Sequence, residues 1–314
     1  MGKCIINEYL VANSKFSSQN KQIAFISDIH SDVNKFKMIF EKLKALKVHA
    51  LLIGGDLIDD NEYVKCNLII KELLYELAKT MKIFIVIGNH DMIFFGGNTS
   101  NYRCEAKSSN LDFFENLTGD NIYVSDMPYN GATLNKWYLD DEIDISSLNL
   151  PIEYYCNKED TKEFLTLLDE VEKPDIDSNK YNILLCHPPK NIFNTWPDNS
   201  YLSQFDLILT GHMHSGMMPY FLRKQTYGRG LVDPYKKLLP KYAYGYLNNN
   251  NNNCTLLISG GITKIPNSLD LGNHKIFGTI YPSELEIFNL QYDPNNNSFE
   301  KVKTKKYSIN TIYR

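Results

Sequence analysis

Short hydrophobic runs alternate with amphipathic stretches in the N-terminal third of the chain. The runs lie at residues 23–27, 50–53 and 83–87, and their lack of polar alternation is typical of strands buried on both faces of a sheet. Between them, hydrophobic residues recur at helical spacing over residues 33–46 and 64–77. This β-α-β-α-β order predicts a parallel sheet that is covered by helices.

The pattern loosens over residues 96–180, where Asp, Glu, Asn and Ser predominate. Helical turns are expected at residues 110–117 and 162–171, and we interpret the whole segment as an insertion on the core. Residues 1–314 would then form a single domain. Strand patterns resume after the insertion, at residues 181–186, 205–209, 255–259 and 284–290.

Composition and charge exclude several classes of protein. Hydrophobic residues make up 43% of the 314 residues and charged residues 22%, which is ordinary for a globular protein. The net charge is −4, and Lys and Arg are scattered, so there is no strong nucleic-acid signal. No apolar run approaches the roughly 18 residues that cross a bilayer, and residues 1–20 lack the apolar centre of a signal peptide. The six cysteines form no C-x-x-C pair, which favours a reducing compartment. We therefore expect a cytoplasmic protein with no membrane span.

Each of the first five predicted strands is followed by residues that can bind a metal ion. In open α/β sheets, ligands bind beyond the carboxyl ends of the strands, so these clusters are expected to converge. Five of the seven histidines of the chain fall in them. The clusters are Asp28-Ile29-His30, Gly54-Gly55-Asp56, Gly88-Asn89-His90-Asp91, His187-Pro188-Pro189 and Gly211-His212-Met213-His214.

These side chains suit a pair of divalent metal ions. Carboxylate, imidazole and amide ligands accept Mn, Fe, Zn, Co or Ni, and no thiolate competes with them. Two carboxylates among neutral ligands leave a positive centre even with a bridging hydroxide. Two ions about 3.5–4 Å apart can direct a hydroxide at phosphorus and stabilise the leaving oxygen. Metal ions would thus give an acidic chain the positive charge that hydrolysis of a phosphate ester requires.

The series D-x-H, G-G-D, G-N-H-D, a lone His after a strand, and G-H-x-H resembles the calcineurin-like metallophosphoesterase superfamily. It runs from Ile23 to His214 in the order of that family. The resemblance implies a four-layer α/β/β/α sandwich of two facing mixed β-sheets. It also implies hydrolysis of a phosphomonoester or phosphodiester by a metal-bridging hydroxide. The C-terminal part, with Gly260-Gly261-Ile262 and the run from Tyr281 to Leu285, is similar to the YkuE/YaeI-type phosphohydrolase branch.

Seven metal ligands follow from this resemblance, with Asp56 bridging two ions. One ion would be held by Asp28, His30 and His214, and the other by Asn89, His187 and His212.

The resemblance also implies a catalytic pair that does not bind metal. His90 would stabilise charge or protonate the leaving oxygen, and Asp91 would orient it. The purple acid phosphatase branch has a tyrosine ligand three residues after the bridging aspartate. Here that position is Asp59, which disfavours a tyrosinate–iron(III) site.

Other interpretations remain open from the sequence. Asp28 and Asp56 are also suited to capping helices. The protein could be a pyrophosphatase that acts on a nucleotide-like substrate, or a binding scaffold of the same fold without activity. We expect a small phosphorylated substrate, held by the 96–180 insertion and by the segment 223–246. Arg223, Lys224 and Arg229 in that segment could bind a second anionic group of the substrate, and its tyrosines could stack on a base. The oligomeric state is left open.

Overall fold

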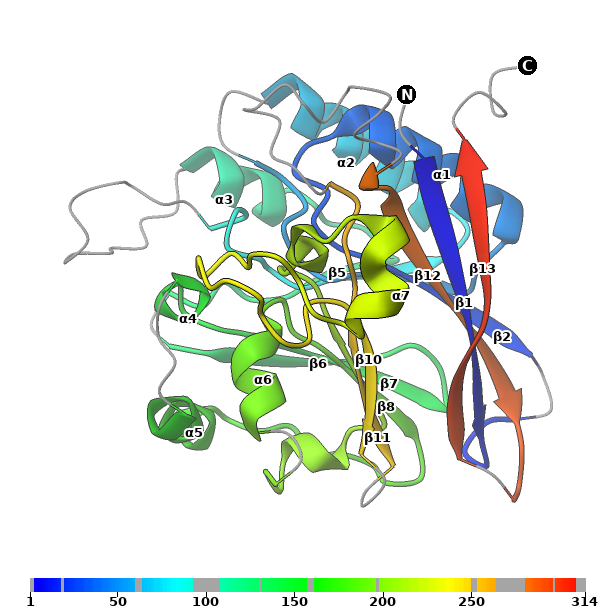
Figure 1. The fold of residues 1–314 in the computed structure, drawn as a ribbon, viewed down its shortest axis with the longest axis vertical. Helices are drawn as coiled ribbons and strands as arrows, with labels where there is room; N and C mark the ends of the chain where they lie inside the picture. Colours follow the sequence, from blue (N-terminus) through cyan, green and yellow to red (C-terminus); the bar gives the residue numbers. More distant parts are fainter. Residues whose placement is uncertain are drawn as a thin grey trace.

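Two facing β-sheets with helices on their outer sides form the protein in the computed structural model (Figure 1). The structure describes residues 3–17, 20–59, 64–92, 108–129, 131–156, 161–195, 198–249, 253–263, 280–295 and 297–308.

The first sheet has seven strands: β1 (Lys3–Asn13), β2 (Lys21–Ile26), β3 (Ala50–Ile53), β4 (Lys82–Ile85), β5 (Ile122–Val124), β12 (Ser283–Tyr292) and β13 (Ser298–Ser308). Their order is β13-β1-β12-β2-β3-β4-β5. Strands β2 to β5 are parallel, whereas β12 runs antiparallel to β2. The predicted β-α-β-α-β unit is therefore the centre of a larger mixed sheet.

The second sheet has six strands: β6 (Thr133–Tyr138), β7 (Ile143–Asn149), β8 (Tyr181–Leu185), β9 (Leu207–Thr210), β10 (Gly245–Asn249) and β11 (Cys254–Ile258). Their order is β10-β11-β9-β8-β7-β6. The four inner strands are parallel, and the edge strands β6 and β10 are antiparallel to their neighbours. The predicted sandwich of two facing mixed sheets is confirmed.

Seven α-helices are described: α1 (Val33–Leu46), α2 (Val64–Ala78), α3 (Ser108–Glu115), α4 (Glu153–Cys156), α5 (Thr161–Glu170), α6 (Pro189–Thr195) and α7 (Arg223–Thr226). Three short 3₁₀ turns are η2 (Leu202–Gln204), η3 (His214–Met217) and η4 (Tyr220–Leu222). Asp32 caps α1, because its side chain accepts a hydrogen bond from the Lys35 backbone N–H at 3.0 Å. None of the described helices combines the length and the hydrophobicity that crossing a membrane requires.

The space between the sheets is filled by large hydrophobic side chains from both of them. Phe25, Leu52 and Phe84 project from β2, β3 and β4, and they pack in one cluster with Ile183 of β8 and Leu207 of β9. The opposite faces of the same strands contact the helices. Burial on both faces explains why these strands read as uninterrupted hydrophobic runs.

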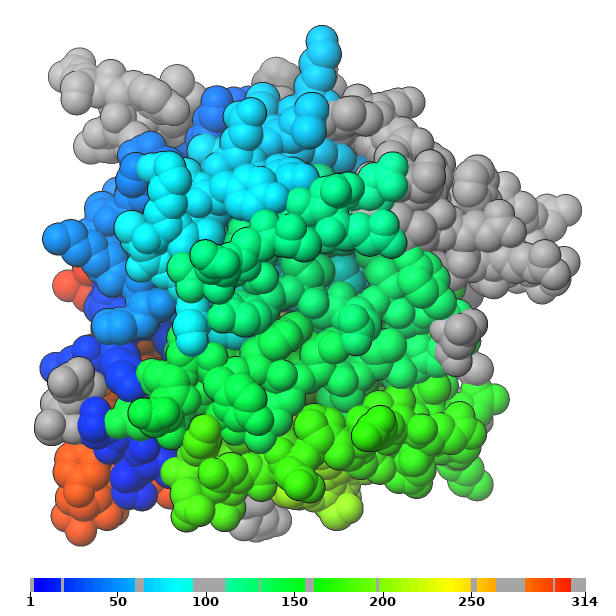
Figure 2. Space-filling model, turned by 180° about the vertical axis from the view of Figure 1, so that it is seen from behind, coloured from blue at the N-terminus to red at the C-terminus, as the bar shows by residue number. Residues whose placement is uncertain are grey.

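The segment 96–180 differs from the insertion that the sequence predicted. Within its described part, β5 extends the first sheet, and β6 and β7 belong to the second. Seen from behind, the green part of the chain packs directly against the cyan N-terminal part (Figure 2). The hydrophobic pattern misses β7 because its buried positions include Asp144, which forms ion pairs with Lys136 and Lys180 at 2.9 and 3.1 Å.

Two long strands at one side of the first sheet were also missing from the sequence interpretation. Strand β1 pairs in parallel with β12 and antiparallel with β13, so segments from opposite ends of the sequence lie side by side (Figure 1). Strand β13 carries several lysines on an edge of the sheet. Charged edge strands are common, because they prevent pairing with other molecules, but they hide the hydrophobic signal of a strand.

Candidate metal centre

The candidate metal-binding side chains lie at the carboxyl ends of strands from both sheets. The first sheet contributes Asp28 and His30 after β2, Asp56 after β3, and Asn89 after β4. The second sheet contributes His187 after β8, and His212 and His214 after β9.

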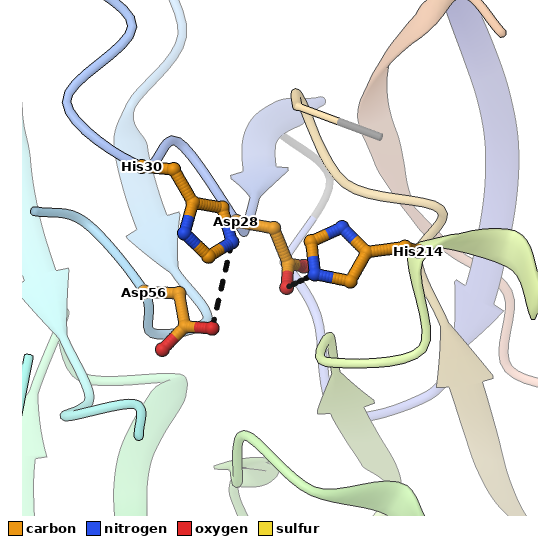
Figure 3. Close-up of side chains that lie close together, drawn as sticks. All are labelled: Asp28, His30, Asp56 and His214. Carbon is orange, nitrogen blue, oxygen red and sulfur yellow. Dashed lines mark ion pairs between the residues drawn. The ribbon is translucent and has the colours of Figure 1, made fainter. Parts of the chain in front are cut away.

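Four of these residues form a first group. Asp28, His30, Asp56 and His214 each offer a ligand atom, and these atoms all lie within 4.8 Å of one another. His30 Nε2 lies 3.6 Å from Asp56 Oδ2, and His214 Nε2 lies 3.5 Å from Asp28 Oδ1. Figure 3 shows the four side chains converging from the loops after β2, β3 and β9, with these two pairs dashed. The spacing is that of a metal site built from carboxylate and imidazole ligands.

A second group consists of Asp56, His187 and His212. His187 Nε2 lies 3.1 Å from Asp56 Oδ2, and the rings of His187 and His212 are 5.1 Å apart. Tyr155 and Tyr235 pack on the ring of His212 at centroid distances of 5.5 and 5.3 Å. Asp56 belongs to both groups, so its carboxylate lies between them.

Four buried atoms at this centre lack a hydrogen-bond partner in the described ranges, apart from the 3.1 Å contact between two of them, Asp56 Oδ2 and His187 Nε2; the other two are Asn89 Oδ1 and His212 Nε2. Buried polar atoms are otherwise almost always paired, because an unpaired one costs about 1–3 kcal/mol. All four can donate an electron pair to a metal ion. The residues present therefore fit a metal centre.

Backbone carbonyl groups orient two of the histidines. His187 Nδ1 lies 2.5 Å from the Gly54 carbonyl oxygen, and His214 Nδ1 lies 2.7 Å from that of Thr263. A carbonyl only accepts, so Nδ1–H is the donor in each pair. In the neutral ring the lone pair is then on Nε2, which faces the centre, as in metal-binding histidines generally.

The backbone at the centre is held in a conformation that side chains disfavour. Asp28, His30, Asp56, His212 and His214 all have a positive φ, between 45° and 66°. This region costs about 1–2 kcal/mol for a residue other than glycine, and such strain gathers at functional sites. It is maintained by a network of loop contacts, in which the backbone N–H groups of Ile29 and His30 both donate to the Asp56 carbonyl.

Gly88, which follows β4, allows the backbone there to approach Asp56 closely. A Cβ atom at Gly88 would lie 2.3 Å from both the backbone nitrogen and Oδ1 of Asp56. Any side chain would therefore displace the Asp56 carboxylate. This close approach gives a physical reason for glycine before Asn89.

His90 lies at the rim, and its partner is not the one that the resemblance implied. Its side chain is 45% exposed, and Nδ1 lies 2.7 Å from Asp59 Oδ1. The Asp91 carboxylate instead accepts hydrogen bonds from the backbone N–H groups of Ile58 and Gly88, at 3.0 and 2.8 Å. Asp91 is fully buried. The contact expected between Asp91 and His90 is therefore replaced by one between Asp59 and His90, and Asp91 holds the loop.

Nearby carboxylates raise the pKa of two of these histidines, whereas burial lowers that of a third. Burial disfavours the charged form of His187, but Asp56 raises its pKa to about 9. Burial and the neighbouring His187 together hold the pKa of His212 well below its usual range. At the rim, partial desolvation disfavours the charged form of His90, but Asp56 and Asp59 outweigh it and raise the pKa of His90 to about 9. The centre thus attracts positive charge.

The arginines of the basic segment 223–246 lie in different surroundings. Arg223 is buried, and its guanidinium forms an ion pair with Glu284 at 2.6 Å. Arg229 instead lines a cavity of about 360 Å³, with Lys190 and Tyr235. The predicted joint binding of a substrate anion by Arg223 and Arg229 does not fit this placement, because Arg223 is already paired.

Sequence reasoning missed three features of the centre: the Asp59 contact, the packing of Tyr155 and Tyr235 on His212, and the Thr263 carbonyl. Asp59 was noted only because it replaces a tyrosine. Its position three residues after Asp56 was a usable signal, since it places a second carboxylate at the same strand end. The other two arise from distant segments and have no local signal.

Residues 21–216 match the family model for calcineurin-like phosphoesterases. An uncharacterized metallophosphoesterase from Helicobacter pylori is 31% identical over 201 residues, which are 62% of this chain and 44% of that protein. The chain thus spans less than half the length of this curated relative. A dimetal phosphatase from Danio rerio has a TM-score of 0.41 at 9% identity, covering 77% of this chain and 88% of the other. Purple acid phosphatase PPD1 from yellow lupin has a TM-score of 0.44 at 13% identity, covering 78% and 44%.

Proposed function

Because the chain belongs to the calcineurin-like phosphoesterase family, we propose that it is a two-metal enzyme that hydrolyses a phosphomonoester or a phosphodiester. The observation that supports this proposal best is the position of Asp56, which belongs to two groups of ligand atoms at once. A carboxylate shared in this way can hold two ions at a short, fixed separation.

The ligands divide naturally between two ions. Asp28, His30 and His214 would hold one, Asn89, His187 and His212 would hold the other, and Asp56 would bridge them. Oxygen and nitrogen ligands of this kind suit Mn, Fe, Zn, Co or Ni. When bound, the ions supply Lewis acidity, which lowers the pKa of water and stabilises negative charge on phosphoryl oxygens.

His90 is proposed as the general acid or charge-stabilising group. It is half-exposed at the rim, where a substrate can reach it, and its Nδ1 contacts Asp59. If Nδ1–H donates to that carboxylate, Nε2 is the atom that can give a proton to the leaving oxygen. Asp59 is then a positioning residue, because it fixes the ring without touching the substrate.

Metal content and hydrolysis should be measured separately. Protein reconstituted with Mn²⁺, Zn²⁺ or Co²⁺ and freed of excess metal should contain two ions per chain by elemental analysis. It should also hydrolyse p-nitrophenyl phosphate or bis(p-nitrophenyl) phosphate. His187→Ala should lose one ion, whereas a change of the exposed His49, which lies outside the centre, should lose none.

Each outcome has a distinct meaning. Protein that binds no transition metal contradicts the assigned ligands. Protein that binds two ions and cleaves neither of these esters, nor a dinucleotide with a pyrophosphate bond, would be a binding scaffold of this fold. Two ions together with hydrolysis support the proposal, and the preferred ester then distinguishes a monoesterase from a diesterase.

A further inference from the structure

Large hydrophobic side chains are exposed together in one segment, residues 220–242. Twelve such side chains are exposed in the described part of the chain, and six of them lie between residues 221 and 239. Leu238 and Leu239 are 77% and 63% exposed, and Phe221 and Tyr227 are 65% and 89% exposed. Single exposed hydrophobic residues are ordinary, but a concentration of them indicates a surface that contacts something apolar.

The same segment is strongly basic. Residues 220–242 contain six cationic side chains and one carboxylate, within a chain whose net charge is −4. Arg223 is buried against Glu284, and the other five cations are exposed. None of the five forms an ion pair with a carboxylate in the described ranges, and the five are Lys224, Arg229, Lys236, Lys237 and Lys241. Their charge is therefore available to an anionic partner.

The exposed leucines belong to an ordered hairpin. The Leu239 backbone N–H donates to the Leu231 carbonyl at 2.9 Å, and Val232 and Leu238 form an antiparallel bridge. Asp233 closes the turn, because its carboxylate accepts a hydrogen bond from the Lys237 N–H at 2.8 Å. The backbone thus has its own partners and holds the leucine side chains at the surface.

This hairpin is attached to the metal centre. The backbone N–H of Leu231 donates to the Gly216 carbonyl at 2.7 Å, two residues after His214. On the buried side of the turn, Tyr235 packs on the ring of His212. A surface that contacts the exposed leucines would therefore lie beside the centre.

We propose that residues 220–242 dock on a lipid bilayer that contains anionic lipids. Leucine and aromatic side chains enter the boundary between head groups and acyl chains, and lysine and arginine remain at the phosphates, as in other interfacial segments. The basic charge selects the anionic surface. Together with the phosphoesterase function proposed above, on which this part rests, the docking assigns the substrate to phosphate esters that are carried by lipids.

Vesicle flotation tests the docking without metal or substrate. The full chain, treated with a chelator, should float with vesicles of phosphatidylcholine and phosphatidylglycerol at low salt. It should bind pure phosphatidylcholine vesicles about tenfold or more weakly, because each basic residue near an anionic surface adds to the affinity. High salt should weaken the binding to the anionic vesicles, since it screens the charges.

Matched variants identify the segment. Leu238→Ser with Leu239→Ser, and separately Lys236→Ala with Lys237→Ala, should each weaken binding about tenfold. The controls are Leu68→Ser, which changes a leucine of α2 that is 56% exposed, and Lys37→Ala with Lys65→Ala, which removes two exposed lysines of α1 and α2. Both controls should bind like the wild type. Thermal unfolding checks that each variant is folded. If the leucine pair does not fold, the lysine pair and the salt series show whether residues 220–242 bind the vesicles.

Three results would overturn the proposal. One is that the wild type fails to bind anionic vesicles at low salt. Another is that both segment variants bind as well as the wild type. The third is a dimer in sedimentation that the leucine variant abolishes, with no vesicle binding, which would assign the surface to a second copy of the chain. A failed phosphoesterase function would appear only in the ester and metal assays, so the two failures are distinguishable.

Discussion

Two buried clusters of charged residues differ in how their polar atoms are satisfied. At the candidate metal centre, buried atoms of Asn89 and His212 have no hydrogen-bond partner among the described residues, and those of Asp56 and His187 lie within hydrogen-bonding distance only of each other. The second cluster, which we call the Arg223 cluster, consists of Tyr9, Arg223, Glu284 and Glu286. There Glu284 accepts hydrogen bonds from Arg223 and Ser215, and Glu286 accepts them from Tyr9 and Ser259.

The difference distinguishes a functional site from a cluster that supports the fold. Both clusters are buried and charged, so neither burial nor charge identifies the functional one. In the Arg223 cluster the carboxyl oxygens accept hydrogen bonds from side chains of the protein itself, although Arg223 Nη2 has no partner among the described residues. In the candidate metal centre the ligand atoms face one another, and a bound cation could satisfy them together. Variants in the Arg223 cluster should alter stability, and variants at the candidate metal centre should alter chemistry.

The largest effect is expected at Asp56. Asp56→Asn should reduce kcat by about 10³-fold, because an amide neutralises the bridging position and removes stabilisation of the transition state. Elemental analysis should also find fewer than two ions. Asp206→Asn is the control, since Asp206 is a largely buried carboxylate paired with Lys15 outside the centre. If Asp56→Asn retained both ions and wild-type turnover, Asp56 would not be a bridging ligand, and the candidate metal centre would not differ in function from the Arg223 cluster.

The next effect concerns His90 and its partner. His90→Asn should keep both metal ions and reduce kcat about 10²-fold on alkyl esters, with less loss on p-nitrophenyl esters, whose leaving group needs little protonation. Asp59→Asn should show the same dependence on the leaving group, but a smaller loss. An equal loss on both esters would mean that His90 stabilises charge without donating a proton.

Asp91→Asn tests whether Asp59, rather than Asp91, positions His90. Asp91 accepts two backbone N–H groups, so its replacement should lower the free energy of unfolding by about 1–3 kcal/mol, measured in urea. The leaving-group dependence should remain that of the wild type. If Asp91→Asn instead reproduced the kinetic signature of His90→Asn, the assignment of Asp59 as the positioning residue would be wrong.

Two arginines of the 220–242 segment test the Arg223 cluster. Arg223→Ala should destabilise the fold by about 3 kcal/mol, because it leaves Glu284 buried without its guanidinium partner. Arg229→Ala should change the free energy of unfolding by less than about 0.5 kcal/mol, since Arg229 is exposed. Urea titration of both variants provides the measurement. Equal losses from the two would remove the distinction between buried and exposed arginine.

The smallest effect is a pH dependence at Glu286. Burial first, and then Glu284, raise the pKa of this carboxyl from 4.5 to about 7 in the folded protein. Between these values the folded chain holds a proton that the unfolded chain has released, so stability falls as the pH rises. The wild type should lose up to about 1 kcal/mol per pH unit relative to Glu286→Gln in this window. Parallel stability curves for the two proteins would contradict the raised pKa.

That the candidate ligand residues converge could be predicted from sequence, because their positions have a local signal. Asp28, Asp56 and His187 directly follow uninterrupted hydrophobic strands, and parallel strands bring their ends together without any further information. The central strands were predictable for the same reason. The prediction therefore depended on strands that are buried on both faces.

The remaining features depend on contacts between distant segments. Strand β7 buries Asp144 through lysines that lie before and after it, which cancels the hydrophobic pattern. Asp59 can be chosen over Asp91 as the partner of His90 only once the turn of the loop is known, because both carboxylates are near in sequence. The exposure of Leu238 gives no sequence signal either, since a leucine normally predicts burial.

The position of β1 has a consequence for how the chain folds. It is the first described strand to leave the ribosome, yet its two neighbours, β12 and β13, are the last. All seven candidate ligands are synthesised before either neighbour exists, while β1 still presents unpaired backbone groups on both edges. Closing the sheet joins residues that are almost the whole chain length apart, the kind of contact that slows folding most. The first sheet can therefore close only after β12 and β13 have been synthesised, which is later than all seven candidate ligands.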